Sequence, residues 1–127
     1  MFDAEVQKLR ETRPLVHCIS NPVSLNDCAN FLLACGASPI MADSPEESAE
    51  ITSSSQALVL KLGMLNPLRF EAMLKSAKAA NQQHIPIVLD PVGVGISSYR
   101  MQSAKELIQS VQLSVIRGNC SEIMALC

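Results

Sequence analysis

Three neighbouring polar residues, Arg117, Asn119 and Glu122, have the types and the spacing to hold a phosphate group or a metal ion. Asn119 and Glu122 stand three residues apart before an apolar run, which is the spacing of a capping box at the start of a helix. Arg117 places a fixed cation just before free helix N–H groups, and that combination suits an anionic phosphate. Helix capping alone is the other interpretation of the pair, and the two roles are compatible.

A fourth candidate, Asp90, ends the apolar run "IPIVLD" and is followed by a proline and by Gly93 and Gly95. Glycines let the backbone approach a ligand closely, and a carboxylate here could hold Mg²⁺, which takes oxygen ligands and keeps several waters. The alternative is an Asp-Pro turn that only ends a strand. Together with Arg117 and Glu122, Asp90 gives a set of cation, carboxylates and amide dipoles. Such a set suits phosphoryl transfer, in which catalysis is mostly positioning and charge stabilisation.

The elements that must position these residues alternate along the chain. Short aliphatic runs, as expected of parallel strands covered on both faces, alternate with stretches of helical periodicity, and Gly, Pro, Asn or Ser marks most junctions. The runs predict strands over residues 14–19, 38–42, 57–62, 85–90 and 114–118. We therefore expect an α/β fold with a mostly parallel sheet and helices on both faces. In such sheets ligands bind at the carboxyl ends of the strands.

Several helices have recognisable boundaries. "SPEE" from Ser44 and "NPLRFEAMLKSAKAA" from Asn66 both combine a capping residue with a proline at the first helical position. Another helix is predicted to begin near Ser24 or Asn26 and to end near Gly36, and a further one to span roughly residues 99–111. The last stretch, "CSEIMALC", provides barely two turns after its cap. We therefore expect the sheet to be cut there, after its fifth strand. Such a cut would leave an unpaired strand edge or uncovered apolar helix faces.

Composition limits the class of protein. The chain has 127 residues and is 48% hydrophobic, so residues 1–127 are expected to form one globular domain or part of one. A net charge of -2 and an aromatic content of 3% argue against nucleic acid as a partner. No apolar run approaches the roughly 20 residues that span a bilayer, and the charged start "MFDAEVQKLRE" is unlike a signal peptide. We expect a cytoplasmic protein that does not enter the membrane.

Other residues with chemical potential have more ordinary interpretations. The cysteines are odd in number and lack zinc-finger spacing, which favours free thiols: Cys18, Cys28, Cys35, Cys120 and Cys127. His17 lies within a predicted strand, where a hydrogen-bonded core histidine is more common than a catalytic one. Met41 ends the second predicted strand and could line a pocket beside the loop after the first, although a core methionine is the default interpretation.

Four stretches in order, "PLVHCISN", "NFLLACGASPIMA", "VLDPVGVG" and "IRGNCSEIMAL", resemble the N-terminal half of the hydroxyethylthiazole kinases, which belong to the ribokinase-like superfamily. The similarity runs from about residue 13 to the end of the chain. It implies phosphorylation of the hydroxyl of 4-methyl-5-(2-hydroxyethyl)thiazole with ATP and Mg²⁺ in thiamine salvage. It also implies a homotrimer with active sites between subunits.

By motif, the resemblance assigns thiazole binding to Asn21, Val23 and Met41. It assigns an ATP-phosphate contact to Arg117, and the metal-handling end to Asp90, Asn119 and Glu122.

Two features depart from the family pattern. The Gly-rich anion hole, the catalytic cysteine and most of the nucleotide pocket of the family are expected beyond residue 127, so no catalytic residue is assigned. In "LKLGML", Lys61 and Met64 replace polar residues of the family pattern Asn-x-Gly-Thr. Two rival hypotheses remain open: another ribokinase-like small-molecule kinase, or a non-catalytic binding or assembly fragment.

Overall fold

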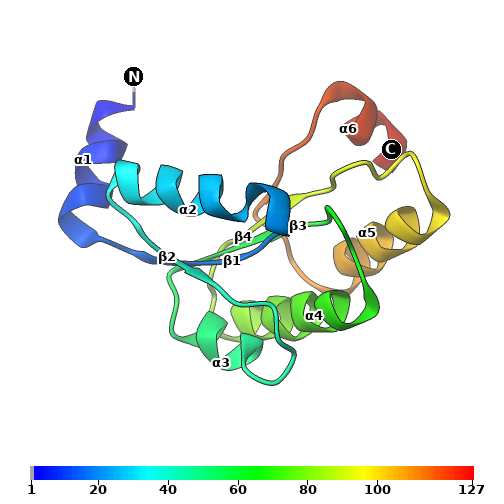
Figure 1. The fold of residues 1–127 in the computed structure, drawn as a ribbon, viewed down its shortest axis with the longest axis horizontal. Coiled ribbons are helices and arrows are strands. Elements are labelled where there is room, and N and C mark those ends of the chain that lie inside the picture. Colours follow the sequence, from blue (N-terminus) through cyan, green and yellow to red (C-terminus); the bar gives the residue numbers. More distant parts are fainter. Residues whose placement is uncertain (1) are drawn as a thin grey trace.

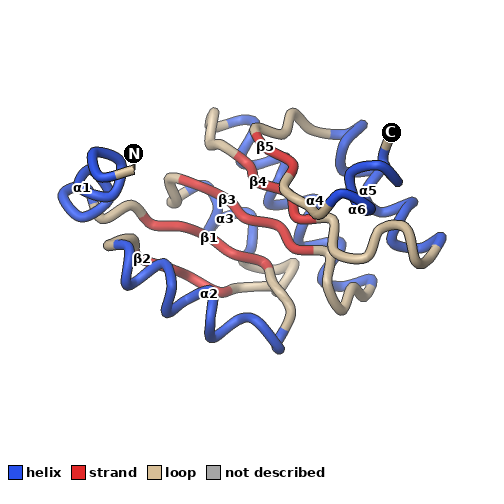
Figure 2. Tube along the Cα trace, turned by 90° about the horizontal axis from the view of Figure 1, so that it is seen from above, coloured by secondary structure: helices blue, strands red, loops and turns tan. Residues whose placement is uncertain are grey.

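The computed structural model describes residues 2–127 and contains one parallel sheet of five strands. The strands lie in the order β2-β1-β3-β4-β5 (Figure 2). Their bounds are β1 Leu15–Ile19, β2 Ser38–Met41, β3 Ala57–Lys61, β4 Ile87–Asp90 and β5 Val115–Ile116. All five predicted strands are thus confirmed, although β5 is only two residues long and both of its residues are exposed. The sheet edge at β5 is consequently the least covered part of the layer.

Helices cover both faces of this sheet, as predicted. Their bounds are α1 Asp3–Thr12, α2 Pro22–Cys35, α3 Ser48–Ser53, α4 Pro67–Gln82, α5 Ser98–Ser110 and α6 Cys120–Leu126. In Figure 1, α2 lies on one face, whereas α3 and α4 lie on the other. None of the helices between residues 2 and 127 is both long and apolar enough to cross a bilayer.

The two faces of the sheet differ in how much apolar surface they bury. The larger core cluster includes Ile19, Leu58 and Leu60 from the strands and Met73 from α4, all 0% exposed. The smaller cluster lies on the α2 side and holds Val16, Cys18 and Ala37, with Met41, Val59 and Leu32 packed against them. No residue of α2 itself is fully buried. The face beneath α2 is therefore the more open side of the layer.

Two predicted helix starts are wrong. α2 begins at Pro22, before Ser24 or Asn26, because Asn21 caps it: its Oδ1 accepts a hydrogen bond from Ser24 N at 3.0 Å. Pro22 then occupies the first helical position, where no backbone N–H is needed. Ser44 caps only a single turn, and the regular helix α3 begins at Ser48.

The other predicted starts and the thiol state are confirmed. Asn66 caps α4 through Arg69 N at 2.9 Å with Pro67 at the first position, and Ser97 caps α5. All five cysteines are free in the described chain.

Candidate functional site

Asp90 and Arg117 form an ion pair at the carboxyl edge of the sheet. Asp90 ends β4 and is 6% exposed, and Arg117 follows β5. Arg117 Nη1 donates to Asp90 Oδ2 at 2.9 Å, and the Arg117 side chain is 74% exposed. One edge of the guanidinium is thus fixed by a nearly buried carboxylate, while its other N–H groups face solvent and remain free to bind an anion.

Asn119 and Glu122 form the predicted capping box at the start of α6. Asn119 Oδ1 accepts from Glu122 N at 2.9 Å, and Glu122 Oε2 accepts from Asn119 N at 2.9 Å. The second Glu122 oxygen, Oε1, accepts from Gly93 N at 3.0 Å. These backbone donors, Gly93 first, lower the pKa of Glu122 from its ordinary value. Glu122 therefore ties the start of α6 to the loop that follows β4.

Gly93 makes that tie possible. Its φ of +64° lies in the left-handed region, where a glycine has no side-chain penalty. A Cβ atom at Gly93 would also lie 2.8 Å from Arg100 Nη1. A cavity of about 560 Å³ opens beside it. The cavity is lined by Gly93, Gly95, Ile96, Asn119, Ser121, Glu122, Met124 and Ala125. We call Asp90, Arg117, Asn119 and Glu122 the phosphate corner.

The predicted thiazole-binding residues lie at the opposite end of the same edge. Asn21 follows β1, Val23 lies in the first turn of α2 and Met41 ends β2. Met41 is the register partner of Cys18, and its side chain packs in the cluster beneath α2. Val23 is 80% exposed. We call Asn21, Val23 and Met41 the acceptor wall.

A polar network at the start of α2 reaches Asn21. The Asn21 Oδ1 atom accepts from Ser24 N and from Ser24 Oγ at 3.2 Å, and Lys61 Nζ donates to Ser24 Oγ at 3.3 Å. Since Oδ1 is used by the helix cap, the Nδ2 group is the part of Asn21 that can bind a ligand as a donor. Lys61, a departure from the family pattern, is thus linked to Asn21 of the acceptor wall through Ser24.

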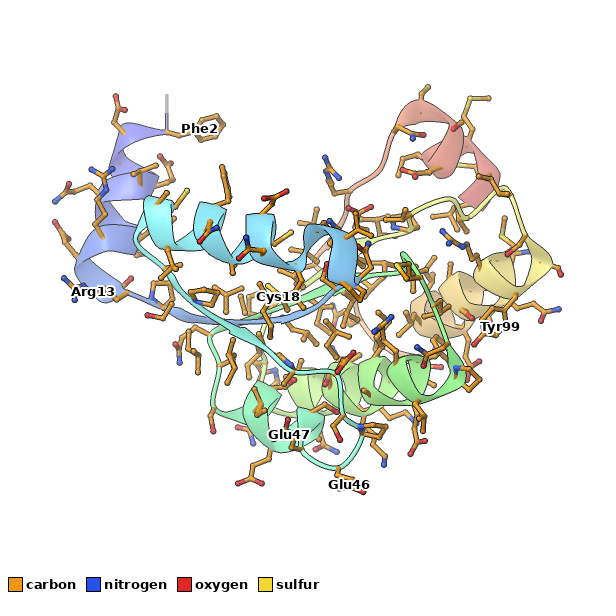
Figure 3. The ribbon with its side chains drawn as sticks, viewed as in Figure 1. Phe2, Arg13, Cys18, Glu46, Glu47 and Tyr99 are labelled. Carbon is orange, nitrogen blue, oxygen red and sulfur yellow. The ribbon has the colours of Figure 1, made fainter. Side chains whose placement is uncertain are left out.

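A second cavity, of about 320 Å³, lies between α2 and the sheet. Figure 3 shows Cys18 on the sheet beneath α2. The lining residues are Cys18, Ser20, Asp27, Cys28, Phe31, Leu32, Val59 and Lys61. The acceptor-wall residues are not among them, so this cavity adjoins the acceptor wall through Lys61 and Ser20 and is not formed by it.

A comparison with protein families shows to which family the chain belongs. The model of the Hydroxyethylthiazole kinase family matches residues 6–127. This chain belongs to that family. It is 52% identical over 126 residues to the hydroxyethylthiazole kinase of Clostridium acetobutylicum, with 99% of this chain and 46% of that protein covered. It is 47% identical to that of Alkaliphilus metalliredigens, with 95% and 44% covered.

A solved hydroxyethylthiazole kinase structure shows the same fold. The protein from Pyrococcus horikoshii OT3 superposes with a TM-score of 0.93 at 41% identity, and the match covers 97% of this chain and 48% of that one. The chain therefore spans about half the length of the hydroxyethylthiazole kinases that it matches.

The residues of the phosphate corner fit the Mg²⁺ that a kinase of this family would use only through intervening water. Asp90, Asn119 and Glu122 have the oxygen ligands that Mg²⁺ takes, but Asp90 Oδ2 already accepts from Arg117, and both Glu122 oxygens accept backbone N–H groups. Between residues 2 and 127 the structure brings together no group of three His, Cys, Asp or Glu side chains that could hold a metal directly. A carboxylate retains further lone pairs, so Asp90 and Glu122 can still accept hydrogen bonds from metal-bound waters.

Two anchoring side chains lie near the acceptor wall, and the sequence predicted only the first of them, His17. His17 is 0% exposed and bonds Thr52 and Ala42, which confirms it as a hydrogen-bonded core histidine. Arg69, in the first turn of α4, contacts Asp43 and the carbonyl of Met64. No short-range pattern in the sequence indicates Arg69, because its partner Asp43 is 26 residues away.

Proposed function

We propose that this chain is the acceptor-binding part of a hydroxyethylthiazole kinase, which transfers the γ-phosphoryl group of ATP to the hydroxyl of 4-methyl-5-(2-hydroxyethyl)thiazole. The observation that carries the proposal is the family match over residues 6–127. The 41% identical structural neighbour of the same name supports it. Phosphate corner and acceptor wall stand at the same edge of one parallel sheet, where ligands of α/β folds bind.

The acceptor wall would orient the alcohol. Asn21 Nδ2 donates a hydrogen bond, while Met41 supplies an adaptable apolar surface for the thiazole ring. Val23, exposed beside them, covers the ring from the first turn of α2. During transfer the alcohol oxygen bonds to the γ-phosphorus, the bond to the bridging oxygen of ADP breaks, and the hydroxyl proton is lost. We assign no acceptor for that proton among residues 2–127.

The phosphate corner would hold the nucleotide. Arg117 donates to a phosphate oxygen while Asp90 fixes the orientation of its guanidinium. Asp90, Asn119 and Glu122 would contact Mg²⁺ through its waters. When bound, Mg²⁺ neutralises negative charge on the transferring phosphate. Asp90 and Glu122 therefore combine a structural role with a place near the metal.

We also propose that the working enzyme is a homotrimer. Val23, Phe31 and Leu33 on α2 are 80%, 69% and 58% exposed, and large apolar side chains that expose this much surface suit a subunit contact. Light scattering of the protein as its gene encodes it measures the mass directly. A monomer at micromolar concentration would contradict this part of the proposal.

The activity is tested by following ADP release from that protein with ATP, Mg²⁺ and three acceptors: the thiazole alcohol, a hexose and pyridoxine. We expect turnover with the thiazole alcohol and a much lower kcat/KM with the others. Preferential phosphorylation of the hexose or of pyridoxine would instead assign the chain to another ribokinase-like kinase, and ADP release with none of them would contradict a kinase.

A further inference from the structure

Arg69 lies in the first turn of α4, outside the acceptor wall, yet its guanidinium joins two loops that support that wall. Its Nε and Nη2 atoms donate to Asp43 Oδ2 at 3.1 and 2.9 Å, and its Nη1 donates to Met64 O at 2.7 Å. The Arg69 side chain is 11% exposed and that of Asp43 is 53% exposed, so the arginine is the buried partner of the pair. The planar guanidinium points donors in fixed, different directions, which suits two acceptors that lie in different loops.

The Asp43 contact holds the loop after β2. Asp43 stands two residues after Met41, and the residue between them, Ala42, is held separately: its carbonyl bonds His17 Nε2 at 2.8 Å. Because a carbonyl only accepts, Nε2 carries the proton, and His17 Nδ1 accepts from the Thr52 hydroxyl at 2.8 Å. The backbone that follows Met41 is thus fixed at two consecutive residues.

The Met64 contact holds the loop after β3. Met64 has a φ of +48°, an uncommon conformation for a residue with a side chain, and the bond from Arg69 to its carbonyl helps to stabilise it. The preceding residue, Gly63, lies directly against the Asn21 side chain, because a Cβ atom there would collide with Asn21 Nδ2. The position of this loop therefore limits the position of the Asn21 amide.

We propose that Arg69 is a positioning residue that sets the separation of Asn21 and Met41, and thereby the size of acceptor alcohol that the enzyme binds. The inference rests on the proposed function and adds a specificity determinant that does not touch the substrate. Arg69 fixes the Met41 side through Asp43 and the Asn21 side through Met64 and Gly63. Loss of either bond lets one side move relative to the other.

The test compares Arg69→Lys and Asp43→Ala with the parent, in the protein as its gene encodes it. Lysine keeps the charge but cannot serve both loops, and Asp43, 53% exposed, can be replaced with little risk to folding. The matched control is Lys78→Met, which removes an exposed cation from the same helix. We expect KM for the thiazole alcohol to rise by on the order of ten-fold in both test variants. We expect kcat and KM for ATP to stay within about two-fold, because uniform binding is lost and not transition-state stabilisation.

Relative kcat/KM for alcohols bearing larger ring substituents should also rise in both test variants, a change that a merely structural role would not produce. The double variant should behave like Arg69→Lys alone, since Asp43→Ala removes a contact that Arg69→Lys has already weakened. Equal losses for all acceptors, a fall in kcat alone, or parent-like kinetics would each overturn the proposal.

Hydrogen exchange separates this inference from the proposed function. In Arg69→Lys, peptides covering residues 38–47 and 57–66 should both exchange faster than in the parent and in Lys78→Met. If the parent does not phosphorylate the thiazole alcohol, the proposed function is wrong. Hydrogen exchange then tests only whether Arg69 holds the two loops together. Faster exchange in both peptides supports it, and a change in one loop or in neither overturns it.

Discussion

The phosphate corner and the acceptor wall lie at opposite ends of one sheet edge, and their supporting contacts differ in exposure to solvent. In the phosphate corner the side chain of Arg117 is 74% exposed, that of its partner Asp90 is 9% exposed, and the neighbouring strand β5 exposes both of its residues. The acceptor wall is supported by the bond between His17 and Thr52, both 0% exposed, and by the Arg69–Asp43 pair, whose side chains are 11% and 53% exposed. Exposed ion pairs contribute about 0–1 kcal/mol to stability, whereas breaking a buried hydrogen bond costs about 1–3 kcal/mol.

This difference has a functional consequence. The other N–H groups of Arg117 face solvent, so in the proposed function the phosphate corner can bind and release a nucleotide without breaking the bond to Asp90. In the proposed function the acceptor wall distinguishes one small alcohol from others, and the buried bonds of His17 help to hold its spacing. Substitutions in the corner should therefore affect kinetics more than stability, whereas substitution of the buried His17 behind the acceptor wall should also reduce stability.

Arg117→Ala should have the largest effect and tests the first half of the comparison. A charge-assisted hydrogen bond to phosphate contributes about 1.5–3 kcal/mol, so KM for ATP should rise by roughly 10- to 150-fold. The melting temperature should fall moderately, because the Arg117 end of the lost ion pair is 74% exposed but Asp90, at 9%, loses its partner. Initial-rate kinetics and thermal unfolding measure the two quantities, and Arg117→Lys, which keeps the charge, should retain part of the ATP affinity. A large loss of stability with an unchanged KM for ATP would contradict the assignment of Arg117 to phosphate binding.

Glu122→Gln is expected to have the next largest effect. Glutamine offers one carbonyl oxygen where Glu122 uses two, so either the Gly93 or the Asn119 N–H loses its acceptor. A stability loss like that of a missing cap, about 1 kcal/mol, should follow. If the carboxylate also contacts metal-bound water, kcat should fall by roughly 10- to 100-fold.

Asn66→Ala is the matched control for Glu122→Gln, because it removes the cap of α4 away from the corner. It should cost similar stability and leave turnover unchanged. Equal turnover in the two variants would restrict Glu122 to capping.

Local patterns in the sequence predicted more of the phosphate corner than of the acceptor wall. The capping box was predictable because Asn119 and Glu122 are three residues apart, and Asp90 because it ends an aliphatic strand. The contacts of Arg69 were not predictable, because Arg69 reaches Asp43 and Met64 only after α4 and two loops have packed together.

The errors at strand and helix ends have local physical reasons. β5 was predicted too long because its aliphatic run resembles a buried strand, although Val115 and Ile116 are 51% and 38% exposed. The start of α2 was placed too late because the apolar periodicity begins after the cap, at Asn21, that fixes its first turn.

Asn21→Ala and Met41→Ala sharpen the second half of the comparison. Both should weaken binding of the thiazole alcohol in isothermal titration, Asn21→Ala by loss of a donor and Met41→Ala by loss of apolar contact. Asn21→Ala should also cost about 1 kcal/mol of stability because it uncaps α2. Asn21→Asp is the informative control: it keeps the capping oxygen but lacks the Nδ2 donor, so stability should return while affinity stays low. Unchanged affinity in all three variants would contradict the assignment of Asn21 and Met41 to binding of the thiazole alcohol.

The smallest expected effect is the pH dependence that His17 gives to the support of the acceptor wall. Burial lowers the pKa of His17 from its ordinary value of 6.5, against the opposing influence of the Ala42 carbonyl and of Glu47. The folded protein therefore favours the neutral ring, and between the two pKa values the unfolded chain binds more protons. Stability from this group is present above pH 6.5 and is lost as pH falls below it.

Urea unfolding between about pH 5.5 and 7.5, above the range in which ordinary carboxylates titrate, isolates this contribution. The parent and His84→Gln, which changes an exposed histidine, should lose stability on acidification. His17→Gln should be less stable throughout, because it cannot reproduce both hydrogen bonds, but its stability should depend less on pH. If His17→Gln keeps the pH slope of the parent, His17 is not the titrating group.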